Sequence, residues 1–240
     1  MCFHPSLLII FGSILPFLLA GCNGWPWREG AVPDSVAMCR ELSQQAIVSM
    51  EADRWQEAEG LLDRAVTACP IDPDARRYYA ETLLQRGASA DALSQLEEAI
   101  RLTPNDTLLV IRAGEICYQM GDYESARRWA TEAINIDPSS ADSWALSGSI
   151  YRAEENPRRA LADFQRALGY RPEDPDLLAA VAEIYMSLGR PGRSLLHLQN
   201  LSETYVSGEV PPAVLARKAD ALTALGRYQE AATHYRMICE

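Results

Sequence analysis

Residues that commonly carry catalysis are few and isolated in this chain. Of its three histidines, His4 lies in an apolar N-terminal segment, and His197 and His234 stand alone. The single lysine, Lys218, has no partner motif, and the spacings of a zinc-protease helix, a serine nucleophile turn and a phosphate-binding loop are missing. We therefore expect no enzyme activity, no metal site and no cofactor.

A long sequence period organises most of the 240 residues. Successive steps of 34 residues, and then one of 37, connect Asp53, Gly87, Gly121, Glu155, Gly189 and Gly226. Five positions after each of these lies a small residue: Ala58, Ala92, Ala126, Ala160, Ser194 and Ala231. A fixed period of this length indicates stacked repeats. Small residues recur where two helices approach closely, and Pro70, Pro104, Pro138 and Pro172 separate one helix pair from the next.

This pattern resembles the tetratricopeptide repeat. The third unit carries Gly121-Asp122-Tyr123, and the fourth carries Trp144, Gly148, Tyr151, Ala160, Phe164, Ala167 and Pro172. The resemblance implies an all-α fold, a right-handed α-α superhelical solenoid of about six helix-turn-helix units. We expect these units at residues 39–72, 73–106, 107–140, 141–174, 175–211 and 212–240.

Two places break the regularity. The fifth unit has Pro191 where an aromatic residue usually sits and three extra residues, which predict either a tolerated surface insertion or a hinge. The sixth unit stops at Glu240 with no polar capping helix after it. Either the chain is the N-terminal repeat region of a larger or truncated regulatory or enzymatic protein, or a partner or second copy covers that end by self-association.

The N-terminal segment is apolar from Ser6 to Ala20, the length of a signal-peptide core and too short for a comfortable membrane span. Leu19, Ala20, Gly21 and Cys22 follow in the order of a bacterial lipobox, although no Lys or Arg precedes the apolar run. The resemblance predicts a lipoprotein signal peptide at 1–21, a lipid on Cys22 and a tether at 22–38. An uncleaved or ordinary signal is the alternative.

The tether contains two tryptophans, Trp25 and Trp27. They are expected either at the lipid headgroups, where such rings prefer to lie, or packed on the first repeat.

The cysteines left after lipid attachment are Cys39, Cys69, Cys117 and Cys239. Cys117 occupies a core position of its repeat. Cys39 begins one helix of the first unit and Cys69 ends the other, so antiparallel pairing brings the two near each other. An exported protein meets an oxidising compartment, which allows a Cys39–Cys69 disulfide.

The net charge of −11 disfavours nucleic acid as a partner, because phosphate binding needs a basic face. The repeat resemblance implies a groove along the first helix of each unit. The groove residues expected from it are Arg77, Glu81, Glu115, Tyr118, Arg152, Glu183 and Asp220. The carboxylates either form a broken acidic ladder that suits a partly basic peptide, or they are solvated or paired with arginines such as Arg77 and Arg112.

These observations favour a non-catalytic scaffold that binds other proteins or peptides and is lipid-anchored in a bacterial cell envelope, facing the periplasm or the exterior. In architecture the chain resembles repeat lipoproteins that assist pilus or secretin assembly or dock cell-wall enzymes. The chaperone-binding clamp of some family members is not expected, because only Arg112 fits its pattern.

Overall fold

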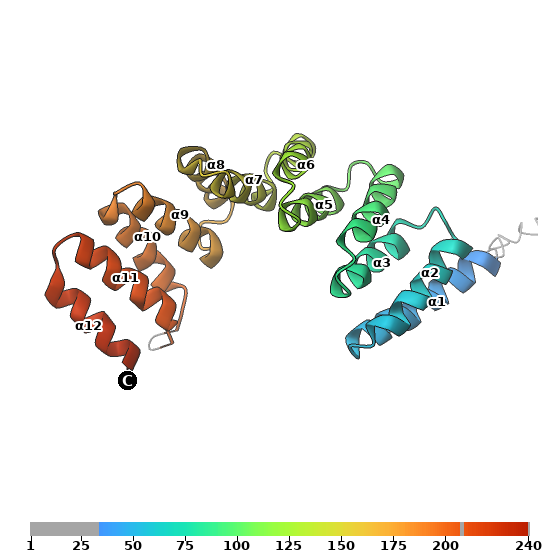
Figure 1. Ribbon diagram of the computed structural model, residues 1–240, viewed down its shortest axis with the longest axis horizontal. Helices are drawn as coiled ribbons and strands as arrows, with labels where there is room; N and C mark the ends of the chain where they lie inside the picture. The colour runs from blue at the N-terminus through green and yellow to red at the C-terminus, as the bar shows by residue number, and fades with distance from the viewer. Residues whose placement is uncertain (1–33, 207–208, 240) are drawn as a thin grey trace, which may run out of the picture. The chain divides into compact units, whose positions relative to one another are not determined.

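The computed structural model describes residues 34–206 and 209–239. Within these residues the chain is entirely helical, and its helices follow one another as packed pairs (Figure 1). The first three pairs are α1 Asp34–Glu51 with α2 Trp55–Ala68, α3 Pro73–Gln85 with α4 Ser89–Leu102, and α5 Thr107–Gln119 with α6 Tyr123–Ile136. The last three are α7 Ala141–Ala153 with α8 Pro157–Tyr170, α9 Pro175–Ser187 with α10 Pro191–Glu203, and α11 Pro212–Ala224 with α12 Tyr228–Cys239. The expected all-α architecture of paired helices is confirmed.

The helix pairs follow the sequence period, with a difference at the first helix. Helix α1 begins at Asp34, so residues 34–38 of the expected tether are helical. The signal peptide, Cys22 and the rest of the tether lie outside the described residues. None of the described helices combines the length and apolar character needed to cross a bilayer.

Short polar side chains cap the N-termini of many of the helices. Asp72, Asp106 and Asp174 each accept two backbone N–H groups at the start of α3, α5 and α9. Ser140 does the same for one N–H of α7. These contacts satisfy N–H groups that have no partner inside a helix.

The residue that heads each sequence period makes the turn between the two helices of a pair. Gly87, Gly121, Gly189 and Gly226 have φ between 67° and 78°, and Asp53 and Glu155 have φ of 56°. This left-handed conformation is open to glycine and strained for residues with a Cβ atom. The period in the sequence is therefore a period of left-handed turns.

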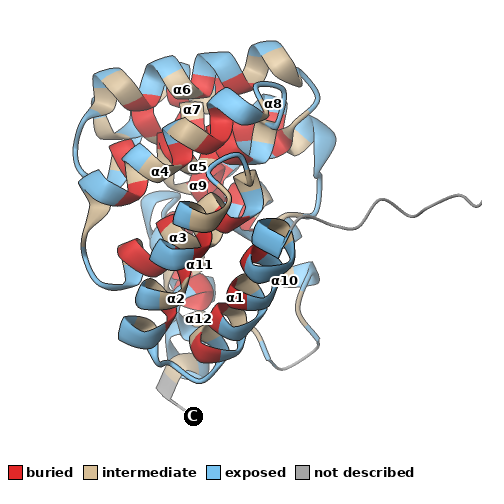
Figure 2. Cartoon of the chain, turned by 90° about the vertical axis from the view of Figure 1, so that its right-hand side faces the viewer, coloured by how far each residue is buried: buried red, intermediate tan, exposed pale blue. Residues whose placement is uncertain are grey.

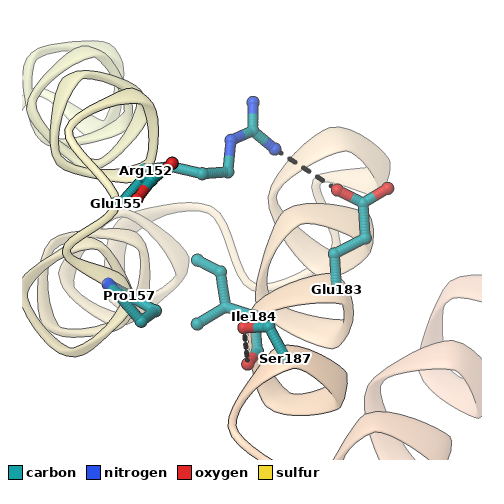
Figure 3. A pocket seen from close by; sticks show the side chains of 6 residues that line it. All are labelled: Arg152, Glu155, Pro157, Glu183, Ile184 and Ser187. Atoms are coloured by element: carbon teal, nitrogen blue, oxygen red, sulfur yellow. Dashed lines mark hydrogen bonds and ion pairs between the residues drawn. The ribbon is translucent and has the colours of Figure 1, made fainter.

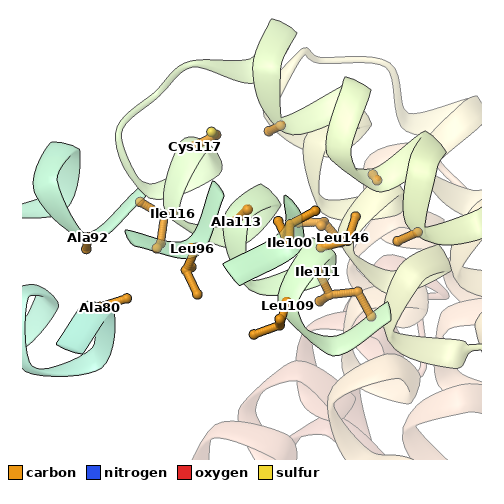
Figure 4. Packing of buried hydrophobic residues seen from close by; sticks show 14 of the residues in the cluster. Ala80, Ala92, Leu96, Ile100, Leu109, Ile111, Ala113, Ile116, Cys117 and Leu146 are labelled. Carbon is orange, nitrogen blue, oxygen red and sulfur yellow. The ribbon is translucent and has the colours of Figure 1, made fainter. Parts of the chain in front are cut away.

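The small residue five positions later is the contact point of the two helices. Ala58, Ala92, Ala126, Ala160 and Ser194 are fully buried, and Ala231 is 3% exposed. Figure 2 shows the buried residues on the faces that the helices turn toward one another. The largest cluster of buried residues joins α3 to α7 through side chains such as Leu96, Ile116 and Leu146 (Figure 4).

Two glycines allow still closer contacts. A Cβ atom added to Gly148 of α7 would lie 2.9 Å from the Phe164 ring of α8. A Cβ atom added to Gly114 of α5 would lie 2.7 Å from Leu146. Gly148 is therefore a steric requirement of the packing, whereas the contact at Gly114 is with the end of a flexible leucine side chain.

The two cysteines of the first pair, Cys39 and Cys69, are free thiols in the structure, and a disulfide between them stays a prediction. The thiol of Cys39 instead donates a hydrogen bond to Asp72 Oδ2, with a distance of 3.4 Å between the heavy atoms. Burial, with help from this carboxylate, raises the pKa of Cys39 to about 11. The thiol is therefore protonated at neutral pH, which slows oxidation because the thiolate is the reactive form.

We predict that Gly148→Ala destabilises the fold. Overpacking a core costs about 1–3 kcal/mol, which exceeds the roughly 0.5–1 kcal/mol that alanine gains over glycine inside a helix. Gly60→Ala in α2 is the matched control, because nothing lies within 4 Å of its added Cβ atom. Urea unfolding should show Gly148→Ala less stable and Gly60→Ala more stable than the parent, and equal effects would contradict the close-contact argument.

We also predict that Glu155→Gly stabilises the chain by about 1 kcal/mol, because it removes a left-handed residue that has a Cβ atom. The reverse change, Gly121→Ala, should lower stability, since Gly121 has φ of 78° and open space around it. Thermal unfolding measures both variants. A Glu155→Gly protein that melts below the parent would show that the Glu155 side chain matters more than its backbone strain.

Candidate functional site

The residues expected to line a groove all lie on odd-numbered helices, and we call the surface that these helices form the odd-helix face. Arg77 and Glu81 lie on α3, Glu115 and Tyr118 on α5, and Arg152 on α7. Glu183 and Asp220 lie on α9 and α11. Apart from Arg152 and Asp220, which are exposed, these residues are half-buried.

The carboxylates at the start of this surface are paired with one arginine. Arg112 donates two hydrogen bonds of 2.7 Å to the two oxygens of Glu81, and one of 2.9 Å to Glu115. The hydrogen bonding of Arg112 to the Glu81 carboxylate is the main reason that the pKa of Arg112 is raised. Glu81 and Arg112 belong to different helix pairs, so this contact also connects neighbouring repeats.

A second group of charges connects three consecutive helix pairs. Arg152 of α7 lies 3.3 Å from a Glu183 oxygen, and Arg217 of α11 forms an ion pair with the other Glu183 oxygen. We call Arg152, Glu183 and Arg217 the Glu183 cluster. One carboxylate on α9 thus bridges arginines on the helices before and after it.

The remaining predicted residues have local partners. The Tyr235 hydroxyl donates to Asp220 Oδ1 at 2.6 Å. Arg77 pairs with Asp74 and lies over the Tyr78 ring, 4.5 Å from its centroid. Tyr118 lies against Tyr123, with ring centroids 5.7 Å apart. Every carboxylate predicted to line the groove therefore has a partner. Arg112 pairs with two of these carboxylates as expected, whereas Arg77 pairs with Asp74, which is not one of them.

Two hollows flank Glu183. The first, of about 360 Å³, is lined by Arg152, Glu155, Pro157, Glu183, Ile184 and Ser187 (Figure 3). The second, of about 210 Å³, is lined by Ala182, Glu183, Met186, Ser194, Leu198, Arg217 and Asp220. Figure 3 shows Arg152 reaching across the first hollow toward Glu183. The odd-helix face is therefore hollowed where α7, α9 and α11 follow one another.

Sequence reasoning did not identify Arg217 and Tyr235 as partners of the expected groove carboxylates. The spacing of the repeat does indicate Arg217. Glu81 and its partner Arg112 are 31 residues apart. Glu183 and Arg217 are 34 residues apart, which is the same spacing plus the three-residue insertion. Tyr235 gave no such signal.

Two further predictions concern lipid attachment and metal binding. The lipid-attachment residue Cys22 and its neighbours Leu19, Ala20 and Gly21 lie outside the described residues. In the part of the chain that the structure describes, no group of three His, Cys, Asp or Glu residues is placed to hold a metal ion.

Known proteins of similar sequence align over the repeats. DnaJ homolog subfamily C member 3 of Gallus gallus is 28% identical over 98 residues, which cover 41% of this chain and 20% of that protein. Human protein O-mannosyl-transferase TMTC1 is 24% identical over 154 residues, which cover 64% of this chain and 16% of that protein. The matched part thus spans about a fifth or less of these relatives' length.

Solved structures of similar shape cover much more of the chain. PilF of Pseudomonas aeruginosa superposes with a TM-score of 0.71 at 14% identity, covering 84% of this chain and 90% of that one. PilW, described as a type IV pilus biogenesis factor, gives 0.70 at 17% identity, covering 82% and 90%. MamA of Desulfovibrio magneticus RS-1 gives 0.63 at 18% identity, covering 72% and 96%. At these identities the likeness shows the fold alone.

Family models settle the classification. One model described as tetratricopeptide repeat matches residues 83–150 and 151–207, which together exceed half of the chain. A second model with the same description matches residues 44–107. Together with the paired helices and the left-handed turns at the head of each period, these matches show that the chain belongs to the tetratricopeptide repeat family.

Proposed function

We propose that this protein is a non-catalytic scaffold that binds a segment of a partner protein on the odd-helix face of α7, α9 and α11. The observation that carries the proposal is the Glu183 cluster with a hollow on each side of it. Apolar hollows with a few fixed polar groups suit the side chains of an extended or helical peptide.

The ion pairs argue against a purely acidic groove. Because arginines neutralise Glu81, Glu115 and Glu183, a strongly basic partner would have to compete with them. The partner segment is better described as mixed, with apolar anchors and few charges. Side chains held by several ion pairs also present a preorganised surface, which lowers the entropy lost on binding.

We propose further that lipid on Cys22 holds the scaffold in a bacterial cell envelope. Support comes from the order Leu19, Ala20, Gly21 and Cys22 after an apolar run. Several acyl chains on one cysteine exceed the single-chain limit of marginal anchoring.

Site-specific photo-crosslinking tests the binding surface. Ser187→p-benzoylphenylalanine places the crosslinker at the first hollow, and Gln199→p-benzoylphenylalanine on the exposed side of α10 is the matched control. In cells that make the protein naturally, we expect an ultraviolet-dependent adduct of defined mass from Ser187 and none from Gln199. Adducts of equal yield at both positions would refute the proposal.

A charge variant tests the Glu183 cluster in the same assay. Glu183→Gln should reduce the Ser187 adduct several-fold, because the two guanidinium groups lose the carboxylate that fixes them. The fold should survive, since a part-exposed ion pair contributes about 0–1 kcal/mol. Circular dichroism of the purified variant checks this, and an unchanged adduct yield in a folded variant counts against the role of the cluster.

Metabolic labelling tests the anchor. We expect a radiolabelled fatty acid to be incorporated into the parent protein and not into Cys22→Ser, because only the cysteine thiol accepts the lipid. Cys117→Ser is the control and should remain labelled. Label retained on Cys22→Ser would exclude acylation at this residue.

A further inference from the structure

Two histidines occupy the same place in consecutive helix pairs. His197 of α10 and His234 of α12 each stand eight positions after the glycine that heads their sequence period, Gly189 and Gly226. Both rings are partly buried, and the Nδ1 atom of each is buried with no hydrogen-bond partner among the described residues. A neutral imidazole tolerates this, because Nδ1 can be the ring nitrogen without a proton. The imidazolium ion carries a proton on both nitrogens and would bury an N–H donor without an acceptor.

The contacts of His197 hold its ring against a buried aromatic side chain. The ring stacks on Tyr185 of α9, with centroids 5.5 Å apart and planes at 16°. Tyr185 is 2% exposed, and its hydroxyl accepts hydrogen bonds from Gln165 of α8 at 2.8 Å and from Arg193 at 3.4 Å. Arg193 also places its guanidinium group over the Tyr185 ring, 5.7 Å from the centroid. Burial lowers the pKa of His197, and no carboxylate of the described residues offsets this effect.

The surroundings of His234 act in the same direction. Burial lowers its pKa most, and the nearby charge of Lys218 on α11 lowers it further. Lys218 is held there by a hydrogen bond of 3.2 Å to the Ser202 hydroxyl of α10. Glu230, one turn before His234 on α12, has the opposite effect on the pKa but is already paired with Arg227. Both histidines therefore fit the folded chain better as neutral rings.

We infer that His197 and His234 make the last two helix pairs an acid-sensitive part of the scaffold. Their protonation weakens the packing of α10 on α9 and of α12 on α11. Because α9 and α11 carry Glu183 and Arg217, the odd-helix face around Glu183 loses its fixed geometry as the pH falls. Release of a bound segment on acidification rests on the proposed function, whereas the acid sensitivity itself does not.

The direction of the pKa shifts gives the pH range. Unfolding returns both rings to the ordinary pKa of 6.5, whereas burial lowers the pKa in the folded chain. The unfolded chain therefore binds more protons below this pH. The stability contribution is complete above pH 6.5 and is lost as the pH falls from there through the folded pKa values. Ordinary carboxyl groups titrate lower, near about pH 4.

Thermal unfolding of the full chain at about pH 7.5 and about pH 5.5 tests the inference, because this range brackets the titration of histidine and not that of ordinary carboxyl groups. The parent Tm should be several degrees lower at the acid pH. The double variant His197→Phe, His234→Phe keeps a ring at each position without a group to protonate, so it should lose less than half as much. Trp129→Phe, at the same position of the third pair, is the matched control and should lose as much as the parent.

A second double variant, His197→Gln with His234→Gln, covers the case in which the phenylalanines prevent folding. Glutamine occupies the same position in the second pair, as Gln95. An equal loss of Tm in the parent and in a folded variant that lacks both histidines would overturn the inference.

Nuclear magnetic resonance locates the effect. The imidazole signals of His197 and His234, assigned with the single variants, should titrate at lower pH than in the urea-unfolded chain. With ¹³C at the methionine methyl groups, the Met186 signal of α9 should change over the same pH range as His197. The Met50 signal of α1, in the first pair, should not. Histidines that titrate as in the unfolded chain, or a Met186 signal that stays constant, would contradict the inference.

The outcomes separate this inference from the proposed function. A Ser187 adduct without the pH response leaves the scaffold standing and removes the acid sensitivity. The pH response without the adduct supports the acid sensitivity and removes the partner-binding role.

Discussion

The structure depends above all on how closely the two helices of each pair approach one another. Fully buried alanines, and Ser194 in the fifth pair, stand at the contact points, and two glycines allow closer contacts still. Side chains larger than these would separate the backbones and weaken the packing of the residues around them. The spacing of the small residues therefore sets the geometry to which the turns, the core clusters and the odd-helix face conform.

Stacking the pairs brings charged side chains of neighbouring repeats together. Arg112 reaches Glu81 of the preceding pair, and Glu183 joins arginines of the pairs on either side. Part-exposed ion pairs add little stability in isolation. Their main effect here is to fix the orientation of long side chains and to reduce the net charge of a surface that its carboxylates would otherwise make acidic.

Several features come together in the region around α9. It has a bridging carboxylate, a hollow on each side and a serine in place of the recurring alanine. The three-residue insertion follows in the same repeat, between α10 and α11. A local loss of regularity in a repeat protein is tolerated because each repeat contacts mainly its neighbours. A repeat protein can thus specialise one region and keep the others for stability.

The sequence by itself determined the family, the all-helical architecture and the position of each turn. These follow from spacing along the chain, because a Gly or its substitute at the head of each period, an alanine five residues later and a closing proline act locally. It also placed Glu81, Glu115, Glu183 and Asp220 in one register of the odd-numbered helices. Tertiary structure decided which partners those carboxylates have, that Arg77 turns to Asp74 and Tyr78, and that hollows flank Glu183. These depend on the rotation and spacing of neighbouring helix pairs and on the side-chain rotamers. The position of a residue in the sequence repeat determines neither the arrangement of the pairs nor the rotamers.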